Sequence, residues 1–165
     1  MKETLNILKQ AILLERRGQA FYRKVAEQTD NEDVRKIFDI MAEEEKLHEA
    51  FLASQYKSFQ DNGKFVEEDL PDEDKDGISN LVLSEDMKKS IEAASYEASA
   101  ISAAIDMETK AIKLYAGHAE KASDPNEKKL FQWLSDWEKT HHKILHDLDE
   151  DLRERVWQDN NFWPF

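Results

Sequence analysis

Two tetrapeptides of the same pattern give the strongest indication of the fold: Glu45-Lys46-Leu47-His48 and Glu138-Lys139-Thr140-His141. Each follows a lone glutamate by 30 residues: Glu15 precedes the first string and Glu108 the second. A helix places residues i and i+3 on one face, so each Glu-x-x-His string presents a carboxylate and an imidazole to the same point. Four carboxylates and two imidazoles are enough to hold two metal ions inside a helical bundle.

The spacing of these residues predicts where the chain turns. Glu15 can face Glu45 and His48 across an antiparallel hairpin only if the turn lies near residues 30–32. Residues 29–33 read Thr-Asp-Asn-Glu-Asp, a helix stop and N-cap followed by acidic residues in a first turn. The second set needs a turn near residues 123–125. The sequence there is Ser-Asp-Pro, an N-cap candidate before a proline at the first helical position.

An internal repeat supports the pairing of the two sets. Residues 11–52 align with residues 104–145 without a gap. Two Glu-x-x-His strings in register, each with its glutamate and its turn, favour paired metal ligands over a solvated helix face. The matching residues are Ala11, Ile12, Glu15, Tyr22, Phe38, Glu45, His48 and Leu52 in the first copy, and Ala104, Ile105, Glu108, Tyr115, Phe131, Glu138, His141 and Leu145 in the second.

The composition narrows the class of protein. The 165 residues suit one domain, and the low content of Gly (4) and Pro (3), with apolar residues at helical spacing, predicts a mostly helical chain. The absence of cysteine excludes disulfides, Cys-ligated clusters and thiol nucleophiles. A net charge of -13 argues against nucleic acid as a partner. No apolar run approaches the ~20 residues of a membrane span, and no signal peptide opens the chain, so we expect a cytoplasmic protein without membrane contact.

The helix and turn signals predict an all-α four-helix bundle over residues 1–154. Gly63 is the expected C-terminal cap of the second helix. A crossover linker over residues 63–84, about 22 residues, can cross a ~40 Å helix, which favours one long crossover between the second and third helices. Ser84–Met87 forms either a separate turn or the start of the third helix. The expected helices span residues 4–28, 32–62, 96–122 and 125–154.

The last residues, 155–165, form an aromatic tail that is too apolar to be free in solvent. We expect this tail to dock on the bundle or on a partner subunit. The chain is expected to form a homo-oligomer, most simply a dimer.

The ligand types indicate which metals fit the predicted site. Carboxylate oxygens suit hard or borderline divalent ions, and a carboxylate can bridge two of them. One imidazole per ion leaves open positions, unlike a closed structural zinc site, and open positions suit dioxygen or peroxide. The donor atoms therefore suit iron or manganese, and zinc is a further alternative.

Two tyrosines and a glycine lie near the predicted ligands. Tyr22 and Tyr115 each stand seven residues after a ligand glutamate and should face the bundle interior. Each has two alternative roles, core packing or a hydrogen bond that holds a ligand carboxylate. Gly18 either leaves space for a bridging ligand or permits close helix contact.

These residues carry a resemblance to known proteins. Glu15, Glu45-x-x-His48, Glu108 and Glu138-x-x-His141, with the aromatic pairs at 21–22 and 114–115, resemble the ferritin-like superfamily. The tract 41–49 is most similar to the rubrerythrin-like branch, and the resemblance covers residues 5–150. It implies a carboxylate-bridged di-iron centre that reacts with dioxygen or hydrogen peroxide. In that centre Glu45 and Glu138 would bridge the ions, Glu15 and Glu108 would be terminal, and His48 and His141 would each bind one ion.

The chain departs from rubrerythrins at two points. It has no cysteine for the rubredoxin-type domain, so turnover requires a separate electron donor protein. Rubrerythrins also have an additional glutamate three residues from a helix ligand, whereas here the corresponding positions hold Ile12, Gly18, Ile105 and Ala111. The plain six-ligand set argues against rubrerythrin-type peroxide reduction and favours ferroxidase or oxygenase chemistry.

The sequence thus predicts a di-iron oxidoreductase of peroxidase or ferroxidase type. Two other functions remain open at this point. One is iron storage or detoxification, with ferroxidase activity that feeds a cage. The other is a metal-free helical interaction module.

Overall fold

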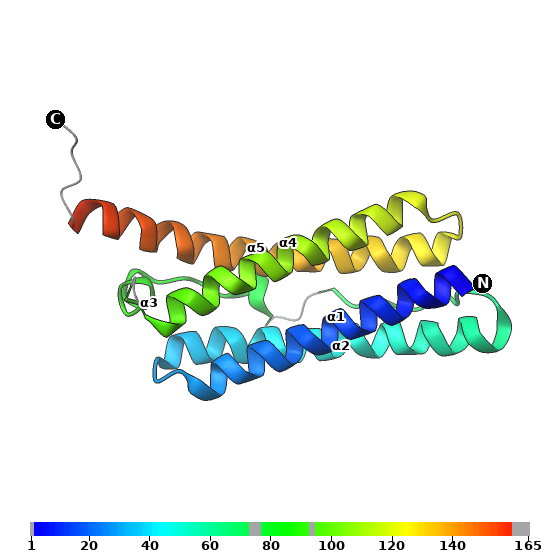
Figure 1. Cartoon of the computed structure of the whole chain (residues 1–165), viewed down its shortest axis with the longest axis horizontal. Helices are drawn as coiled ribbons and strands as arrows, with labels where there is room; N and C mark the ends of the chain where they lie inside the picture. Colours follow the sequence, from blue (N-terminus) through cyan, green and yellow to red (C-terminus); the bar gives the residue numbers. More distant parts are fainter. Residues whose placement is uncertain (1, 73–76, 93–94, 160–165) are drawn as a thin grey trace.

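The computed structural model describes residues 2–72, 77–92 and 95–159, and within these ranges the chain is all-α. The prediction of an all-α, ferritin-like bundle is confirmed (Figure 1). Two short elements, η1 and α3, lie in the connection between the second and third long helices. The elements are α1 (Lys2–Gln28), α2 (Glu32–Asn62), η1 (Ile78–Asn80), α3 (Glu85–Lys89), α4 (Tyr96–Lys121) and α5 (Pro125–Asp159).

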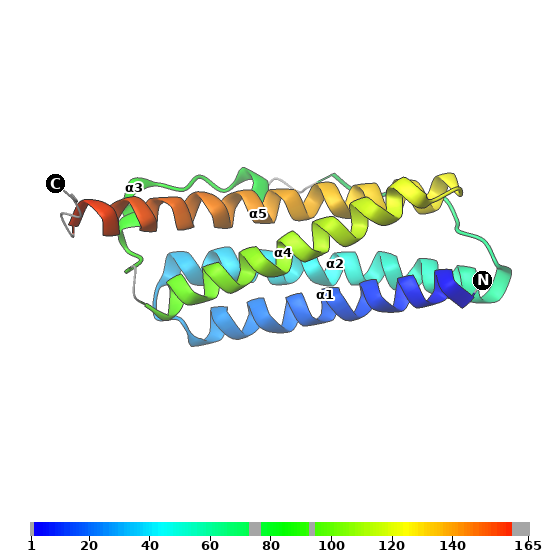
Figure 2. The same cartoon turned by 45° about the horizontal axis from the view of Figure 1, so that its top comes forward.

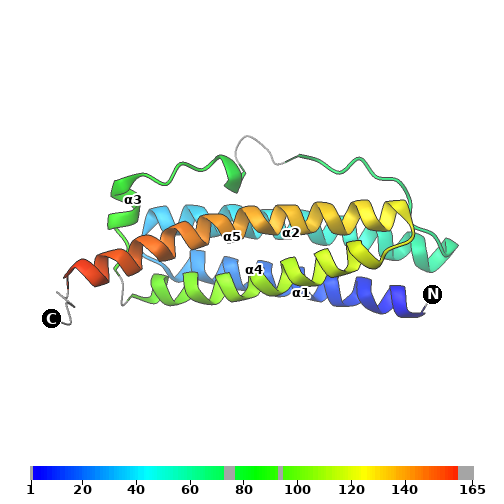
Figure 3. The same cartoon turned by 90° about the horizontal axis from the view of Figure 1, so that it is seen from above.

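Two antiparallel hairpins, α1–α2 and α4–α5, make up the bundle. The chain leaves α2 at one end of the bundle and runs back along its outer face to reach α4 (Figure 3). As a result α2 and α4 run in the same direction, which confirms the predicted long crossover (Figures 1 and 2). None of the described helices has an apolar stretch long enough to cross a bilayer.

The helix ends use the caps that the sequence predicts. The Asn31 side chain accepts hydrogen bonds from the backbone N–H groups of Asp33 and Val34 at the start of α2. Gly63 ends α2 in the left-handed conformation, with φ 67° and ψ 20°, and this conformation favours glycine. The Asp124 carboxylate accepts from the backbone of Asn126 at the start of α5. These caps fix the two turns that bring the hairpins together.

The structure differs from expectation at the end of α5, which continues to Asp159 instead of ending near residue 154. Arg155 supplies a physical reason, because its guanidinium donates hydrogen bonds of 2.8 and 2.9 Å to the backbone carbonyls of Lys88 and Ile91. Ser84 caps α3 as a separate short helix. The expected docking of the aromatic tail stays a prediction, because residues 160–165 lie outside the described part of the chain.

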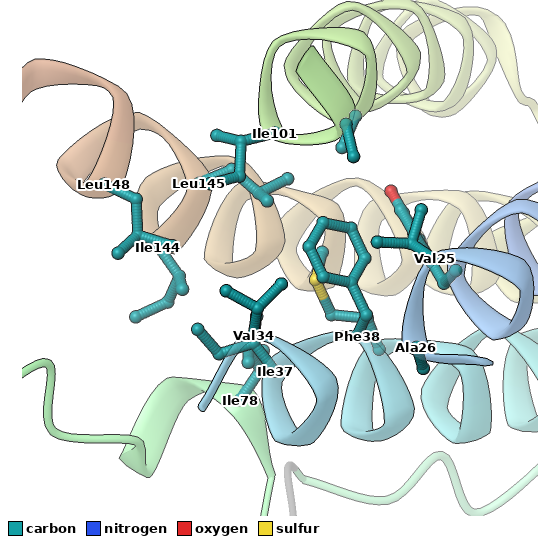
Figure 4. Close-up of a cluster of buried hydrophobic side chains, with 14 of the residues drawn as sticks. Val25, Ala26, Val34, Ile37, Phe38, Ile78, Ile101, Ile144, Leu145 and Leu148 are labelled. Carbon is teal, nitrogen blue, oxygen red and sulfur yellow. The ribbon is translucent and has the colours of Figure 1, made fainter. Parts of the chain in front are cut away.

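The apolar core consists of two clusters, one toward each end of the bundle. One of them gathers residues from both hairpins and from the linker, including Val25, Phe38, Ile78, Ile101 and Leu145 (Figure 4). The other is built around Leu8, Leu52, Tyr115, Phe131 and Leu134. Between the two clusters lies a layer of buried glutamate and histidine side chains.

The crossover linker is attached to the bundle by specific contacts. Trp133 Nε1 donates a hydrogen bond of 2.8 Å to the carbonyl of Pro71. The buried amide of Gln55 exchanges hydrogen bonds with the backbone of Val66. Ile78 is completely buried against the first core cluster. The linker is therefore part of the packed structure near the polar layer.

Ile78→Ala tests how much the linker contributes to stability. Removing a completely buried isoleucine side chain should lower the free energy of unfolding by about 2–5 kcal/mol. Val82→Ala is the control, because Val82 lies in the same linker and is 80% exposed. The control should stay within about 0.5 kcal/mol of wild type in urea unfolding. Equal effects of the two substitutions would contradict a packed linker.

Candidate metal centre

The six predicted ligand residues lie together in the middle of the bundle. Each long helix contributes: α1 and α4 one glutamate each, and α2 and α5 one glutamate and one histidine each. All six side chains are buried, with at most 4% of any residue exposed. They are Glu15, Glu45, His48, Glu108, Glu138 and His141.

These residues form two overlapping groups. In each group, one ligand atom from every member lies within 4.8 Å of the others. Glu45 and Glu138 belong to both groups. The first group also contains Glu15 and His48, and the second contains Glu108 and His141. Two ion positions that share two carboxylates are the arrangement of a carboxylate-bridged pair.

Glu138 lies between the two imidazoles. Its Oε1 is 3.0 Å from His48 Nδ1, and its Oε2 is 3.1 Å from His141 Nδ1. Both Glu138 oxygens are buried without a hydrogen-bond partner among the described residues. A buried carboxylate is costly unless it is paired with cations. The two imidazoles pair with Glu138 when they are protonated, and a metal ion on each side could take the place of those protons. The donor set and this unsatisfied carboxylate both fit a pair of divalent ions.

The two lone glutamates are held by tyrosines from the opposite hairpin. The Tyr22 hydroxyl on α1 donates to Glu108 Oε1 on α4, and the Tyr115 hydroxyl on α4 donates to Glu15 Oε1 on α1. Both tyrosines are also completely buried in the core. Their position therefore combines the two alternative roles, packing and carboxylate orientation. The crossed pair links the hairpins at the level of the site.

Gly18 makes room for a predicted bridging carboxylate. A Cβ atom at this position would lie 3.2 Å from Cδ and Oε1 of Glu45. That is tighter than ordinary van der Waals contact, so the carboxylate would have to move. The close approach of α1 to the Glu45 side chain accounts for a glycine inside a helix, where glycine costs about 1 kcal/mol relative to alanine.

A fifth buried carboxylate, that of Glu44, joins the four predicted ones at the site and was not itself predicted. His141 Nε2 donates a hydrogen bond of 2.6 Å to Glu44 Oε2, and the backbone N–H of Ile78 donates one of 3.0 Å to Glu44 Oε1. Burial acts against ionisation of Glu44, but these hydrogen bonds outweigh it and lower its pKa. In the sequence Glu44 lies inside a run of three glutamates, which is typical of a solvated helix face. The only feature of the sequence that sets Glu44 apart is that the second copy of the repeat has Trp137 at the corresponding position.

The charges of the metal-free cluster are balanced by protons. Burial and the nearby carboxylate of Glu138 raise the pKa of Glu108 to about 8, and burial with neighbouring carboxylates also raises the pKa of Glu45. Burial opposes ionisation of Glu138, but His48 and His141 lower its pKa more strongly. Burial lowers the pKa of both histidines, but the surrounding carboxylates outweigh it and raise both values. Metal binding must displace these protons.

The raised pKa of Glu108 predicts that the metal-free protein loses stability as pH rises. The unfolded chain releases this proton near pH 4.5, whereas the folded chain keeps it until about pH 8. Folding therefore takes up a proton in this window, so stability falls from pH 5 to pH 8. The raised histidine pKa values act in the same direction above pH 6.5. Melting temperatures measured with a chelator should decline across this range.

Glu108→Gln is the control for this pH dependence, because the amide has nearly the same shape and does not titrate. The variant should show a smaller decline in melting temperature than the wild type. A wild-type melting temperature that is constant or rises from pH 5 to pH 8 would contradict the prediction. An unchanged decline in Glu108→Gln would show that Glu108 is not its source.

Gly18→Ala and Gly117→Ala form a matched pair for the Glu45 contact. Both glycines lie inside long helices, but a Cβ at Gly117 would meet no atom within 4 Å. Gly117→Ala should gain up to about 1 kcal/mol of helix stability and keep wild-type metal affinity. Gly18→Ala should displace Glu45 and weaken metal binding about tenfold. Calorimetric titration measures the affinities, and equal affinities in the two variants would rule out the steric role of Gly18.

Comparison with known proteins identifies a family that matches this chain. Searches of curated proteins and of solved structures each found no match. The Rubrerythrin family profile matches residues 6–149, which includes all six clustered glutamates and histidines and both tyrosines. Members of this family have the ferritin-like bundle described above. The match covers most of the chain, and the protein therefore belongs to the rubrerythrin family of the ferritin-like superfamily.

Proposed function

We propose that this chain is a non-haem di-iron protein that reacts with dioxygen or hydrogen peroxide. The observation that carries the proposal is the pair of overlapping Glu/His groups that share Glu45 and Glu138. Family membership supports the same function. In the proposed centre Glu45 and Glu138 bridge the ions, and each ion also has one terminal glutamate and one histidine. Glu15 pairs with His48, and Glu108 pairs with His141.

The donor atoms favour iron over structural zinc. Four carboxylates and two imidazoles offer each ion mostly hard oxygen ligands and a single nitrogen. An iron pair held this way supplies electrons to an oxidant through its change of oxidation state. The protein residues keep the site dry, because all six side chains are buried between two apolar clusters. Tyr22 and Tyr115 hold the terminal carboxylates in place as the charge of the centre changes.

The space beside the site favours a small oxidant. A cavity of about 10 Å³ lies between α1 and α4, against both proposed bridging glutamates. Its volume is enough for about one water-sized molecule. Dioxygen or peroxide fits the immediate surroundings of the centre better than a large organic substrate. The cavity therefore supports a small oxidant, such as dioxygen or peroxide, in the space directly against the bridging glutamates.

The source of electrons favours the ferroxidase reaction. A ferroxidase oxidises Fe(II) as its substrate and needs no further reductant, whereas a peroxidase cycle needs a separate electron donor for a chain without cysteine. Where rubrerythrins have an additional glutamate, the candidate positions of this chain are apolar or glycine: Ile12, Gly18, Ile105 and Ala111. Of these, Ala111 is buried in the second core cluster. We therefore place Fe(II) oxidation first, with dioxygen or peroxide as the oxidant.

Iron loading tests the proposal directly. Anaerobic addition of Fe(II) to the chelator-treated protein should give about two irons per chain by elemental analysis. Rapid mixing with dioxygen or with hydrogen peroxide should then produce a new visible absorption, and the faster reaction identifies the preferred oxidant. Glu138→Gln should lose most of the bound iron, because Glu138 belongs to both groups.

Glu127→Gln is the control for the loss of one carboxylate from α5. Glu127 lies in the first turn of α5, away from the clustered residues, and the variant should bind iron as the wild type does. A wild-type protein that holds no iron after loading would overturn the proposal. Retention of zinc alone, with no oxidation of added Fe(II), would remove the redox function and leave the fold unchanged.

A further inference from the structure

The two halves of the repeat differ at the position that directly precedes each proposed bridging glutamate. Glu44 directly precedes Glu45 in the first Glu-x-x-His string, whereas Trp137 directly precedes Glu138 in the second. Both Glu44 and Trp137 are buried. The two sides of the centre therefore have different chemical surroundings, although the six proposed ligands are arranged symmetrically.

His141 has a carboxylate behind its ring. Its Nδ1 faces the shared glutamates, and its Nε2 donates the 2.6 Å hydrogen bond to Glu44 Oε2. The other oxygen of Glu44 accepts the 3.0 Å hydrogen bond from Ile78 N–H in η1. Because both oxygens are engaged, Glu44 is fixed between α2 and the linker. It therefore holds the His141 ring in one orientation.

His48 has aromatic rings in the corresponding place. Its Nδ1 also faces the shared glutamates, at 3.0 Å from Glu138 Oε1. Its Nε2 is buried and has no hydrogen-bond partner within the described ranges of the chain. The rings of Trp133 and Trp137 pack edge-on against the imidazole, with centroids 5.3 and 5.0 Å away. On its outer side, away from the glutamates, this ring is therefore held by packing and not by a hydrogen bond.

A hydrogen bond to the outer nitrogen strengthens a histidine as a metal ligand. The bond keeps the proton on that nitrogen, leaves the lone pair of the other nitrogen for the ion, and makes the imidazole more basic. Loss of such a partner typically costs about 10- to 100-fold in metal affinity. The negative charge of Glu44 adds to the attraction for a cation. His141 has these advantages and His48 lacks them.

The geometry points to Glu44 as a positioning residue that makes the two metal positions unequal, so that the ion bound by His141 and Glu108 binds first and more tightly. The ion bound by His48 and Glu15 is then the exchangeable one. This rests on the dinuclear centre of the proposed function and refines it. In a ferroxidase reaction, substrate iron enters and leaves at the His48 position, while the His141 position stays filled.

Anaerobic calorimetric titration of the metal-free full chain with Fe(II) tests the inequality. The wild type should show two binding steps whose dissociation constants differ by about 10- to 100-fold. Glu44→Gln keeps an oxygen for Ile78 N–H, but its amide N–H₂ group cannot accept the His141 proton. This variant should lose at least about tenfold in the tighter step and little in the weaker one. Circular dichroism verifies that it folds.

Glu43→Gln is the matched control. It removes a carboxylate one residue away on α2, from a side chain that is 58% exposed and paired with Arg23. Both binding steps should stay at their wild-type values, which separates the hydrogen bond to His141 from a general effect of charge. Loss of the tighter step in this control as well would overturn the role of Glu44.

His48→Ala assigns the steps independently of Glu44, so the test stands even if Glu44→Gln does not fold. The variant should lose the weaker step and keep the tighter one. Two equal steps in the wild type, or loss of the tighter step in His48→Ala, would overturn the inequality of the positions. No Fe(II) binding at all would overturn the proposed function itself, which is a different result from two equal steps.

Discussion

Four carboxylates and two imidazoles are buried together in the middle of a small helical bundle, and the surrounding helices must compensate for the cost of burying them. Buried charges are costly unless they are paired and hydrogen-bonded. In the metal-free protein protons take part in that pairing, as the raised pKa of Glu108 shows. The two apolar clusters on either side of the polar layer must supply the stability that the layer does not. Metal ions that bind only the folded state would add to it.

The two halves of the internal repeat contribute the same kinds of residue to the buried charged layer. Each hairpin supplies one lone glutamate, one Glu-x-x-His string and one tyrosine, and each tyrosine binds the lone glutamate of the other hairpin. The site is therefore complete only when the two hairpins are packed together. The proposed metal site therefore belongs to the whole bundle and not to either hairpin alone.

The crossover linker breaks the symmetry of the repeat. It returns along the outer face of α2 and α5 (Figure 3). There the backbone N–H of Ile78 donates a hydrogen bond to Glu44, whose other oxygen accepts one from His141. The corresponding place behind His48 is filled by Trp133 and Trp137. Two positions with equivalent direct ligands thus differ in the groups that support them. Loss of such a supporting group typically costs about 10- to 100-fold in metal affinity.

The helices, the turns and the six clustered residues could be predicted from the sequence, because helical spacing and caps are local signals and the internal repeat shows them twice. Asn31, Gly63 and Asp124 illustrate this, since each acts at its predicted place. Tertiary structure alone decided three other features: the crossed bonds of Tyr22 and Tyr115, the space that Gly18 leaves for Glu45, and the inclusion of Glu44 in the site. These features depend on contacts between residues distant in the chain, and Glu44 stands in a run of glutamates that local pattern assigns to solvent. Only the packing of α2 against α5 and the linker shows that its carboxylate turns inward to His141.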